Sequence, residues 1–343
     1  MKNFAIGVDL GGTNLRIAAV DDQGALIEKV TLGTKVSLGR DHVVDDMCRA
    51  IQQVLKKYRN SANLLGIGIG VPGIIDMQTG LLRESPNLPG WADYPVRAEI
   101  EQRLKTVVIL ENDANVAALG EKWLGAAKDY DHMAMLTLGT GVGGGLVLHG
   151  SIWHGMNGMA GEFGHTTVEP EGHPCGCGNR GCLEQYASAT AIVRMARETI
   201  AQNANSPLAK AAHADAEFSA KSLYNLSIQG DEDARQIYRR VGRCLGIVLS
   251  AMVNSLNLPI YVIGGGVSSA WEAFSPTIFS ELRQRCMVYA ATAPPDPLAS
   301  NHGASAHVEP GPGHKTIITR ALLGSDAGLY GAARLPMIPA EKR

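Results

Sequence analysis

Residues Ile6–Val20 read IGVDLGGTNLRIAAV, which is two apolar, β-rich runs joined by the turn Gly11-Gly12-Thr13. This pattern predicts a strand, a tight turn and a second strand. Residues Ala134–Leu148, AMLTLGTGVGGGLVL, repeat the pattern without gaps at an offset of 128 residues. Helical periodicity follows each copy. The sequence therefore predicts two related α/β halves that face one another, because the repeat is too long for a solenoid.

Strands and helices alternate through the rest of the chain, as is typical of α/β proteins. The stretch 290–314 is rich in Pro, Ala, Gly and His and has no periodicity, so we expect a long loop or a lid there. Further strands are expected at 25–31, within 64–73, at 106–111 and within 258–269. Helices are expected at 41–59, from about 114, at 187–203, 233–257 and 271–288, and from 326.

The composition is that of a globular enzyme and excludes several classes of protein. Apolar residues make up 45% and charged residues 19% of the 343 residues, and the net charge is −2, so there is no basic field for nucleic acid or an anionic membrane. The chain has no apolar run of about twenty residues and no signal-peptide pattern. We therefore expect a cytoplasmic protein, in which clustered cysteines indicate metal binding or catalysis before disulfides.

Three glycine turns offer backbone N–H groups that no side chain obstructs: Gly11-Gly12-Thr13, Gly139–Gly145 and Gly264-Gly265-Gly266. Such turns can bind the phosphates of a nucleotide, and neighbouring threonine hydroxyls add donors. One turn alone is more simply a tight hairpin or a strand–helix turn. Two matching turns in repeated halves favour phosphate binding. The pattern is neither a Walker A loop nor a Rossmann fingerprint.

Acidic residues near strand ends are candidates for catalysis. Asp9 adjoins the first glycine turn, where its carboxylate could hold Mg²⁺ directly or through water, or could only cap the turn. Asp113 lies where a buried strand passes into a helix, the usual place of a ligand-facing residue in α/β sheets. It could accept a proton from a substrate hydroxyl. Alternatively, Asn112 or Asp113 is simply the N-cap of the helix.

Polar side chains flank a group of cysteines. Glu162 and His165 in GEFGH, together with Glu184, make a set of carboxylates and a neutral imidazole that suits an uncharged polyol. Lone acids and histidines are mostly surface residues or satisfied polar groups, so each of them alone would be a weak signal.

Three of the six cysteines stand in HPCGCGNRGC, residues 173–182, with the spacing Cys175-x-Cys177-x₄-Cys182. Three thiolates need one more ligand for tetrahedral zinc. His165 and His173 are nearby, and His165 is favoured because His173 is only two residues from Cys175, in a loop already bent by proline. Free thiols or a disulfide pair are the alternatives. A zinc ribbon that binds nucleic acid is weaker, because ribbons pair two Cys-x-x-Cys knuckles and this region is not basic.

These motifs, in this order, resemble those of the ROK family of sugar kinases and regulators over nearly the whole chain. They are the Asp9 turn DLGGTN, ENDAN from Glu111, the glycine stretch Leu138–Gly145, GEFGH, CxCGxxGCxE and GGGV from Gly264. The resemblance implies an α/β fold of the actin-like ATPase (ribonuclease H-like) type, with two domains flanking a cleft. We expect residues 1–114, completed by the C-terminal helix at about 320–336, to form the smaller domain. Residues 115–319, with a zinc-binding loop at 165–184, form the larger one.

The resemblance also implies ATP-dependent phosphorylation of a sugar hydroxyl, with Asp113 as the catalytic base. His165 and the three cysteines match the family's structural zinc set. The implied sugar contacts are the backbone of Gly73 and the side chains of Asn87, Asn112, Glu162, His165 and Glu184. ATP and Mg²⁺ are expected at Asp9, Gly11, Gly12, Thr13, Asn14, Thr140, Gly141 and Gly265.

Among the family's kinases the chain is most similar to bacterial glucokinases, which implies phosphorylation of the C6 hydroxyl of D-glucose. Kinases for fructose, N-acetylmannosamine and allose share the core motifs. Regulators of the family carry an N-terminal helix-turn-helix domain, whereas only three residues precede the first expected strand here. We therefore expect an enzyme and not a non-catalytic sugar sensor. The expected partners are a sugar substrate and further copies of the chain, as a homodimer or homotetramer, but neither nucleic acid nor membrane.

Overall fold

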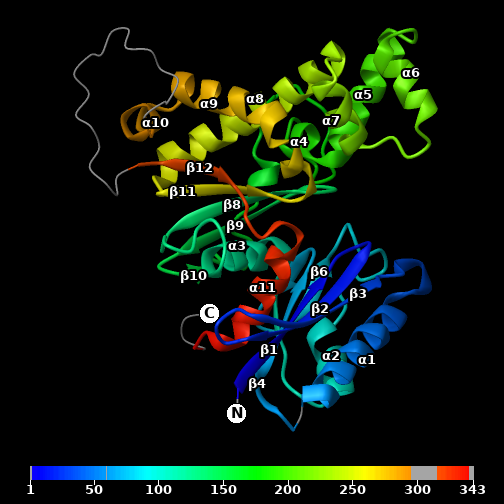
Figure 1. The fold of residues 1–343 in the computed structure, drawn as a ribbon, viewed down its shortest axis with the longest axis vertical. Helices are drawn as coiled ribbons and strands as arrows, with labels where there is room; N and C mark the ends of the chain where they lie inside the picture. The colour runs from blue at the N-terminus through cyan, green and yellow to red at the C-terminus, as the bar shows by residue number, and fades with distance from the viewer. Residues whose placement is uncertain (1, 59, 295–314, 340–343) are drawn as a thin grey trace. The chain divides into compact units, whose positions relative to one another are not determined.

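The computed structural model describes residues 2–58, 60–294 and 315–339. The chain forms two compact α/β units (Figure 1). The first unit comprises Met1–Met135, Gly144–Gly161 and Leu322–Arg343, and the second comprises Leu136–Gly143 and Glu162–Ala321. The division into domains at residue 114 stays a prediction. Within the described ranges, no helix is both long and apolar enough to cross a membrane.

The N-terminal sheet has five strands in the order β3-β2-β1-β4-β7. β2 pairs antiparallel with both β1 and β3, whereas β4 pairs parallel with both β1 and β7. A two-stranded hairpin, β5-β6, accompanies the sheet. The strands are β1 (Lys2–Leu10), β2 (Asn14–Asp21), β3 (Leu26–Gly33), β4 (Ala62–Val71), β5 (Ile74–Asp76), β6 (Leu81–Glu84) and β7 (Ile109–Asn112).

A second five-stranded sheet has the order β10-β9-β8-β11-β12, which matches the first sheet position for position. Each sheet contains a hairpin around a glycine turn and ends in a parallel pair, β4 with β7 or β11 with β12. This correspondence confirms the internal repeat that the sequence predicts. The strands are β8 (Met133–Leu138), β9 (Val142–Leu148), β10 (Ser151–Ile152), β11 (Ile260–Gly264) and β12 (Ile317–Arg320).

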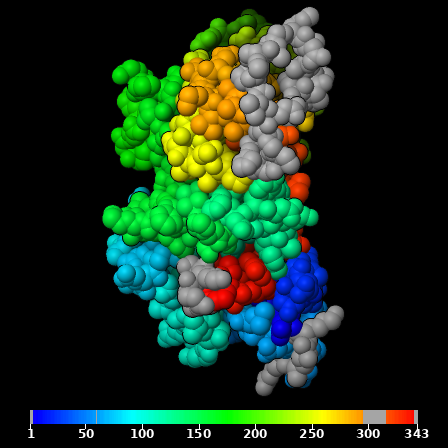
Figure 2. Space-filling model, turned by 90° about the vertical axis from the view of Figure 1, so that its left-hand side faces the viewer, coloured from blue at the N-terminus to red at the C-terminus, as the bar shows by residue number. Residues whose placement is uncertain are grey.

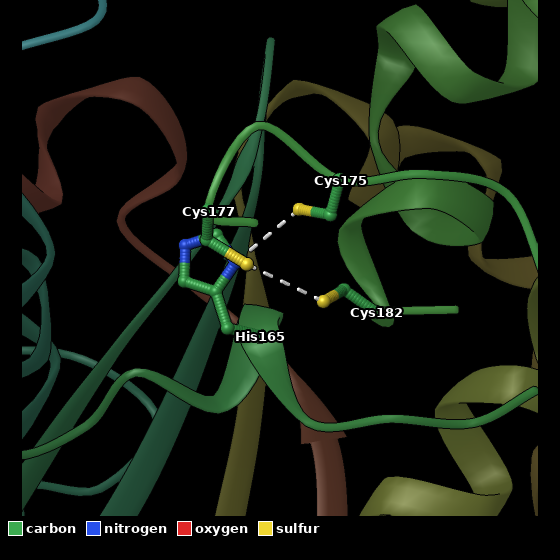
Figure 3. Close-up of side chains that lie close together, drawn as sticks. All are labelled: His165, Cys175, Cys177 and Cys182. Carbon is green, nitrogen blue, oxygen red and sulfur yellow. Dashed lines mark hydrogen bonds between the residues drawn. The ribbon is translucent and has the colours of Figure 1, made fainter. Parts of the chain in front are cut away.

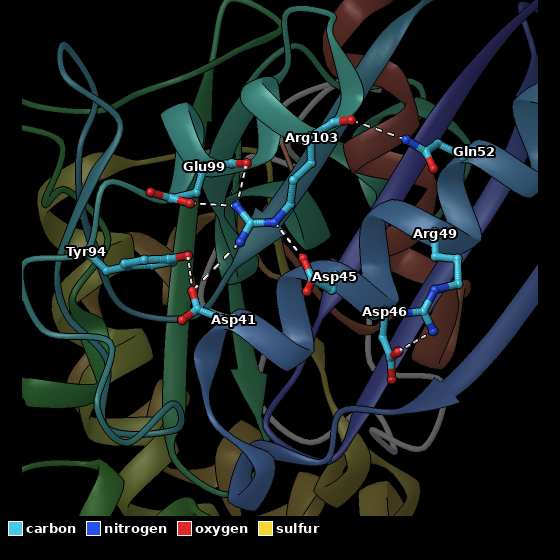
Figure 4. Close-up of polar contacts among 8 residues, drawn as sticks. All are labelled: Asp41, Asp45, Asp46, Arg49, Gln52, Tyr94, Glu99 and Arg103. Carbon is cyan, nitrogen blue, oxygen red and sulfur yellow. Dashed lines mark hydrogen bonds and ion pairs between the residues drawn. The ribbon is translucent and has the colours of Figure 1, made fainter.

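One face of the N-terminal sheet is covered by α1 (Arg40–Tyr58) and α2 (Val96–Leu104). Alternate residues of β1, including Ile6 and Val8, point into this core, as the period of a strand requires. The two helices also contact each other through Arg103 of α2, whose Nε lies 2.6 Å from a carboxylate oxygen of Asp45 in α1 (Figure 4). These groups are partly exposed, so the contact orients the helices more than it stabilises the fold.

The other face of this sheet is covered by α3 (Asp113–Trp123) and α11 (Ala327–Arg334). Figure 2 shows the surface of α11, in red, beside the blue N-terminal strands. Glycine allows a close approach of the two helices, because a Cβ at Gly331 would lie only 1.6 Å from the carbonyl oxygen of Val116. The C-terminal helix and the helix that begins at Asp113 therefore pack as one layer.

Besides its strands, the second unit contains helices and two short 3-10 turns. The sequence predicts one helix over 187–203, but Ser188 accepts the N–H of Ala191 and begins a new helix there. The helices are α4 (Glu184–Ala187), α5 (Ala189–Gln202), α6 (Pro207–Ala214), α7 (Ala220–Ile228), α8 (Glu232–Leu256), α9 (Trp271–Arg285) and α10 (Met287–Thr292), and the 3-10 turns are η2 (Phe163–His165) and η3 (Gly266–Ala270).

The loop expected over 290–314 is wrong at its beginning, because α10 extends to Thr292. The helix expected to continue to 288 instead ends at Arg285. The thiol of Cys286 accepts the N–H of Tyr289 at 3.2 Å and so caps α10, a role that sequence rules do not assign to cysteine. The rest of that expected loop, 295–314, lies outside the described residues.

Candidate active site and metal centre

The first glycine turn joins β1 to β2, and it requires glycine because another segment of the chain lies close to its backbone. The Gly11 N–H donates to the carbonyl of Asn14 at 2.9 Å, which closes the turn. A Cβ at Gly12 would lie 2.9 Å from the carbonyl oxygen of Asn87, so the structure places Asn87 beside this turn. Thr13 and Asn14 are exposed and accessible to a ligand.

Asp9 precedes this turn, and its carboxylate faces the start of α11, since a Cβ at Gly328 would lie 3.3 Å from Cγ of Asp9. The carboxylate lies 3.0 Å from Nη1 of Arg16, yet burial raises the pKa of Asp9 more than Arg16 lowers it. A second ion pair, Lys29 with Asp326 at 2.6 Å, also acts on the pKa of Asp9: the charge of Asp326 raises it and that of Lys29 lowers it. A half-buried carboxylate whose charge is incompletely compensated fits a role in holding a divalent cation.

Asp113 is the first residue of α3 and directly follows the parallel strand β7. The N-cap of the helix is Asn112, whose side-chain oxygen accepts the N–H groups of Ala114 at 2.9 Å and Asn115 at 3.2 Å. The Asn112 amide donates to the carbonyl of Gly73 at 3.1 Å, which joins two of the predicted sugar contacts. Asn112 is thus the cap, and the half-buried Asp113 carboxylate lies at a helix N-terminus, where negative charge is favoured.

A buried ion pair lies next to these residues, and the sequence analysis missed it. Glu111 of β7 is 2% exposed, and its Oε2 lies 2.6 Å from Nε2 of His154, which follows β10. Its Oε1 accepts the N–H of Asn112 at 2.8 Å and the side-chain amide of Asn115 at 3.0 Å. The hydrogen bond to Glu111 raises the pKa of His154. The pair therefore fixes the end of β7, which Asp113 directly follows.

The only signal in the sequence for this pair was a carboxylate in an apolar strand. A buried charge needs a partner, so Glu111 in VVILE indicates that a residue of opposite charge or a hydrogen-bond donor lies nearby. The partner is 43 residues away, and the sequence offers no spacing that identifies it.

The second glycine turn joins β8 to β9 and lies against a carboxylate. Oε2 of Glu184 accepts the N–H of Val142 at 3.0 Å, and a Cβ at Gly141 would lie 2.4 Å from this oxygen. The carbonyl of Thr140 accepts the hydroxyl of Thr190, in α5, at 2.9 Å. The backbone of this turn thus donates to an anionic group, as a phosphate-binding turn would, but the group here is Glu184.

The third glycine turn meets the second one at the ends of neighbouring strands. Gly265 follows β11 with φ of 82°, and a Cβ there would lie 2.4 Å from the carbonyl oxygen of Leu138 at the end of β8. A groove of about 640 Å³ runs along α5 from Ala189 and Thr190 to Phe218. Because Thr190 is bonded to the second turn, this groove begins at that turn.

His165 ends the turn η2 and Glu162 directly precedes it, and this turn packs on the beginning of β9. A Cβ at Gly164 would lie 2.0 Å from the carbonyl oxygen of Val142, and Glu184 accepts the N–H of the same residue. The structure therefore brings three predicted sugar contacts of the second unit together. Nε2 of His165 lies 3.8 Å from a carboxylate oxygen of Glu162.

Four side chains of the second unit converge in Figure 3: His165, Cys175, Cys177 and Cys182. Their possible ligand atoms all lie within 4.8 Å of one another, and Nδ1 of His165 is the nitrogen that faces the sulfurs, 3.6 Å from Sγ of Cys175. His173 is directed elsewhere, with its Nδ1 2.9 Å from the carbonyl oxygen of Pro174.

The surroundings of the sulfurs fit a metal site. Side-chain amides donate to two of them, Asn179 to Cys182 at 3.5 Å and Gln185 to Cys175 at 3.6 Å. Burial raises the pKa of Cys182 to about 12, whereas the backbone N–H of Asn179 lowers the pKa of Cys177. Amide donors to sulfur favour the thiolate, and one imidazole with three thiolates is a common zinc set.

Comparison with known proteins agrees with this architecture. The model of the ROK family matches residues 5–311. The glucokinase of Thermotoga maritima is 41% identical over 83% of this chain and 87% of its own length, and that of Halalkalibacterium halodurans is 38% identical over 96% and 94%. The structure of a ROK family glucokinase from Streptomyces griseus in complex with glucose and AMPPNP is 31% identical, covers 97% of this chain and 98% of its own, and superposes with a TM-score of 0.75. The chain therefore belongs to the ROK family.

Proposed function

We propose that this protein is an ATP-dependent hexose kinase that phosphorylates the C6 hydroxyl of D-glucose. One observation carries the proposal: the half-buried carboxylate of Asp113 lies in the first turn of α3, directly after β7, where Asn112 is the N-cap and Oδ1 of Asp113 also accepts the N–H of Ala114 at 2.9 Å. The similar glucokinases, one of them solved with glucose and AMPPNP, support the sugar and the phosphoryl donor.

Asp113 acts as the general base in this proposal. Its carboxylate accepts the proton of the C6 hydroxyl while the hydroxyl oxygen forms a bond to the γ-phosphorus of ATP. The bond from that phosphorus to the β–γ bridging oxygen breaks, and ADP leaves with the electron pair. Glu111 and His154 contribute by holding the strand end, since Glu111 accepts the N–H of Asn112.

The glycine turns are assigned to the nucleotide. Gly11, Gly12, Thr13 and Asn14 of the first turn, Thr140 and Gly141 of the second and Gly265 of the third offer donors and close approach to phosphate oxygens. Asp9 would hold Mg²⁺, which offsets phosphate charge when bound. The groove along α5 is assigned to adenosine, because it begins at the second turn and has apolar walls such as Val193 and Phe218.

The sugar contacts are assigned to neutral groups and two carboxylates. They comprise the carbonyl of Gly73 and the side chains of Asn87, Asn112, Glu162, His165 and Glu184. No lysine or arginine belongs to this set, so it offers nothing that would select an acidic sugar. An uncharged hexose is therefore the favoured substrate.

A coupled assay of ADP release across a hexose panel tests this function. We expect ADP release only when sugar is present and the highest kcat/KM with D-glucose. A higher kcat/KM with fructose, allose or N-acetylmannosamine would overturn the choice of sugar but leave the kinase reaction intact. Sugar binding without ADP release would instead identify a non-catalytic sugar sensor.

We further propose one structural zinc, held by Nδ1 of His165 and the thiolates of Cys175, Cys177 and Cys182. Four protein ligands complete a tetrahedral site and leave no position for water, so the metal has a structural and not a Lewis-acid role. It would fix the His165 ring with Nε2 on the side of Glu162, facing the proposed sugar, and it would anchor Glu184, two residues after Cys182.

Elemental analysis and the variant Cys177→Ser test this zinc. The native protein should contain about one zinc per chain. The variant should be poor in zinc and less stable, and its kcat/KM for sugar should fall by up to about 10²-fold, the cost of displacing a contact by about 1 Å. Cys48→Ser, which changes a buried thiol of α1, should keep its zinc. A metal-free native protein or a fully active Cys177→Ser variant would refute the site.

A further inference from the structure

The first unit contains a pocket that the proposed reaction does not use. It has a volume of about 410 Å³ and is lined by the C-terminal part of α3, the segment after it, the turn before β10 and the end of α11. This volume is in the range of small-molecule sites, about 300–1,000 Å³. None of its lining residues is assigned to ATP, sugar or zinc.

Positive charge dominates this pocket. Lys122, Lys128 and Arg334 line it together with His149, and no Asp or Glu of the described part of the chain does so. Lys122 and Arg334 each lie in the last turn of a helix, where a cation complements the helix dipole. That explains each cation by itself. It does not explain why both converge with Lys128 on one cavity.

Arg334 is the least compensated of these cations. Burial lowers the pKa of Arg334, and no carboxylate in the described ranges pairs with it. Its guanidinium lies over the ring of Trp123, 5.1 Å from the centroid, and its hydrogen-bond acceptor is the sulfur of Met337 at 4.0 Å. A bound anion would compensate the charge of this guanidinium, and two of its N–H donors can bind two oxygens of a phosphate at once.

Lys122 is already oriented by neighbouring acceptors. Its Nζ lies 3.1 Å from the carbonyl oxygen of Lys128 and 3.3 Å from a carboxylate oxygen of Asp131, which is 77% exposed. An exposed carboxylate neutralises a lysine only weakly. Lys122 therefore keeps most of its attraction for a second anion, and the fixed backbone of Lys128 places both lysines at the same pocket.

We infer that this pocket binds a small molecule that carries a phosphate group. Arg334 and Lys122 would bind the phosphate oxygens, with Lys128 at the exposed edge, while Leu119, Trp123 and Ile338 would cover an apolar part of the ligand. The site is built on α3, so the ligand binds to the helix that begins at Asp113.

Calorimetric titration with phenyl phosphate, and with inorganic phosphate for comparison, tests the inference. We expect saturable binding of phenyl phosphate, tighter than that of phosphate, which weakens as ionic strength rises. AMPPNP and D-glucose at saturation should not compete with it. Competition by AMPPNP would place the phosphate at the nucleotide turns and overturn the inference, as would the absence of binding up to about 10 mM.

Variants locate the binding. Arg334→Gln should raise the Kd for phenyl phosphate by about tenfold or more, because one charged hydrogen-bond partner is lost. Lys128→Gln, at an exposed position that the fold does not need, should raise it about threefold. Lys56→Gln removes one exposed positive charge from α1 and should leave the Kd unchanged. An unchanged Kd in both pocket variants would show that Arg334 and Lys128 do not bind the phosphate, and it would overturn the inference.

Discussion

The two glycine turns occupy the same place in two sheets of the same strand order, yet they carry different chemistry. The first adjoins Asp9, which is paired with Arg16. At the repeat offset the second has Thr137 in place of Asp9, and its nearby carboxylate is Glu184, from a different element. The repeat thus gives both turns the same backbone arrangement, whereas the side chains beside each turn differ.

The edge strands show the same asymmetry. β7 carries Glu111 and Asn112 and leads directly to Asp113. β12 takes the corresponding place in the second sheet, has the sequence Ile-Ile-Thr-Arg without a carboxylate, and is followed by Ala321. Of these two edge strands, β7 is the one that leads to the proposed general base.

The largest expected effect is on Asp113. Asp113→Asn should lower kcat by at least about 10²-fold, because an amide cannot accept the hydroxyl proton. Sugar binding should persist, since asparagine keeps an acceptor. The matched control is Asp231→Asn at the N-cap of α8, where the carboxylate accepts the N–H of Ala234 at 2.8 Å and asparagine is an equally good cap. Near-normal turnover of Asp113→Asn would remove the asymmetry between the two sheets.

The fold was predictable because its signals are local. Alternating apolar residues and glycine turns reveal both hairpins, and the change from strand to helix at Asn112 places Asp113 correctly. His165 could be preferred over His173 as the fourth zinc ligand because a chain of ten residues can turn back toward Cys175, whereas two residues cannot do so without strain. The helix α10 was missed because it has six residues and a cysteine cap, which leave no periodic pattern.

Contacts across long separations could not be predicted in the same way. The pair of Glu111 with His154 depends on where β10 ends relative to β7, which no local pattern encodes. The carboxylate of Glu184 on the second turn also depends on tertiary packing. From the sequence, Gly141 is a phosphate-facing position and a substitution there should affect ATP. The structure adds that the same substitution would displace a predicted sugar contact.

The paired variants Gly12→Ala and Gly141→Ala sharpen the comparison of the turns. A Cβ at Gly12 would meet the carbonyl of Asn87 at 2.9 Å, and one at Gly141 would meet Glu184 at 2.4 Å. Both should raise the KM for ATP, by about tenfold for a displaced charged contact. Gly141→Ala should raise the KM for sugar more than Gly12→Ala does, because its Cβ meets the side-chain carboxylate of Glu184, whereas the Cβ at Gly12 meets the backbone carbonyl of Asn87.

The control for these variants is Gly33→Ala, since a Cβ there meets nothing within 4 Å. It should leave both KM values unchanged. If Gly141→Ala raised only the KM for ATP, Glu184 would not be a sugar contact, and the second turn would serve phosphate alone.

The smallest expected effect concerns the pair of Glu111, in β7 of the first sheet, with His154, which follows β10 of the second sheet. His154→Gln keeps a donor for Glu111 but loses the positive charge, which should cost about 1 kcal/mol and lower the Tm by roughly 2 °C. Because the hydrogen bond to Glu111 raises the pKa of His154, the native pair is fully stabilising below the unfolded pKa of about 6.5 and weakens as pH rises through the folded pKa. Calorimetry should therefore find the Tm difference largest near pH 6 and smaller near pH 9.

The control is His213→Gln, at an exposed position in α6, which should show no such dependence on pH. An equal Tm difference at both pH values would mean that His154 acts through packing and not through its charge.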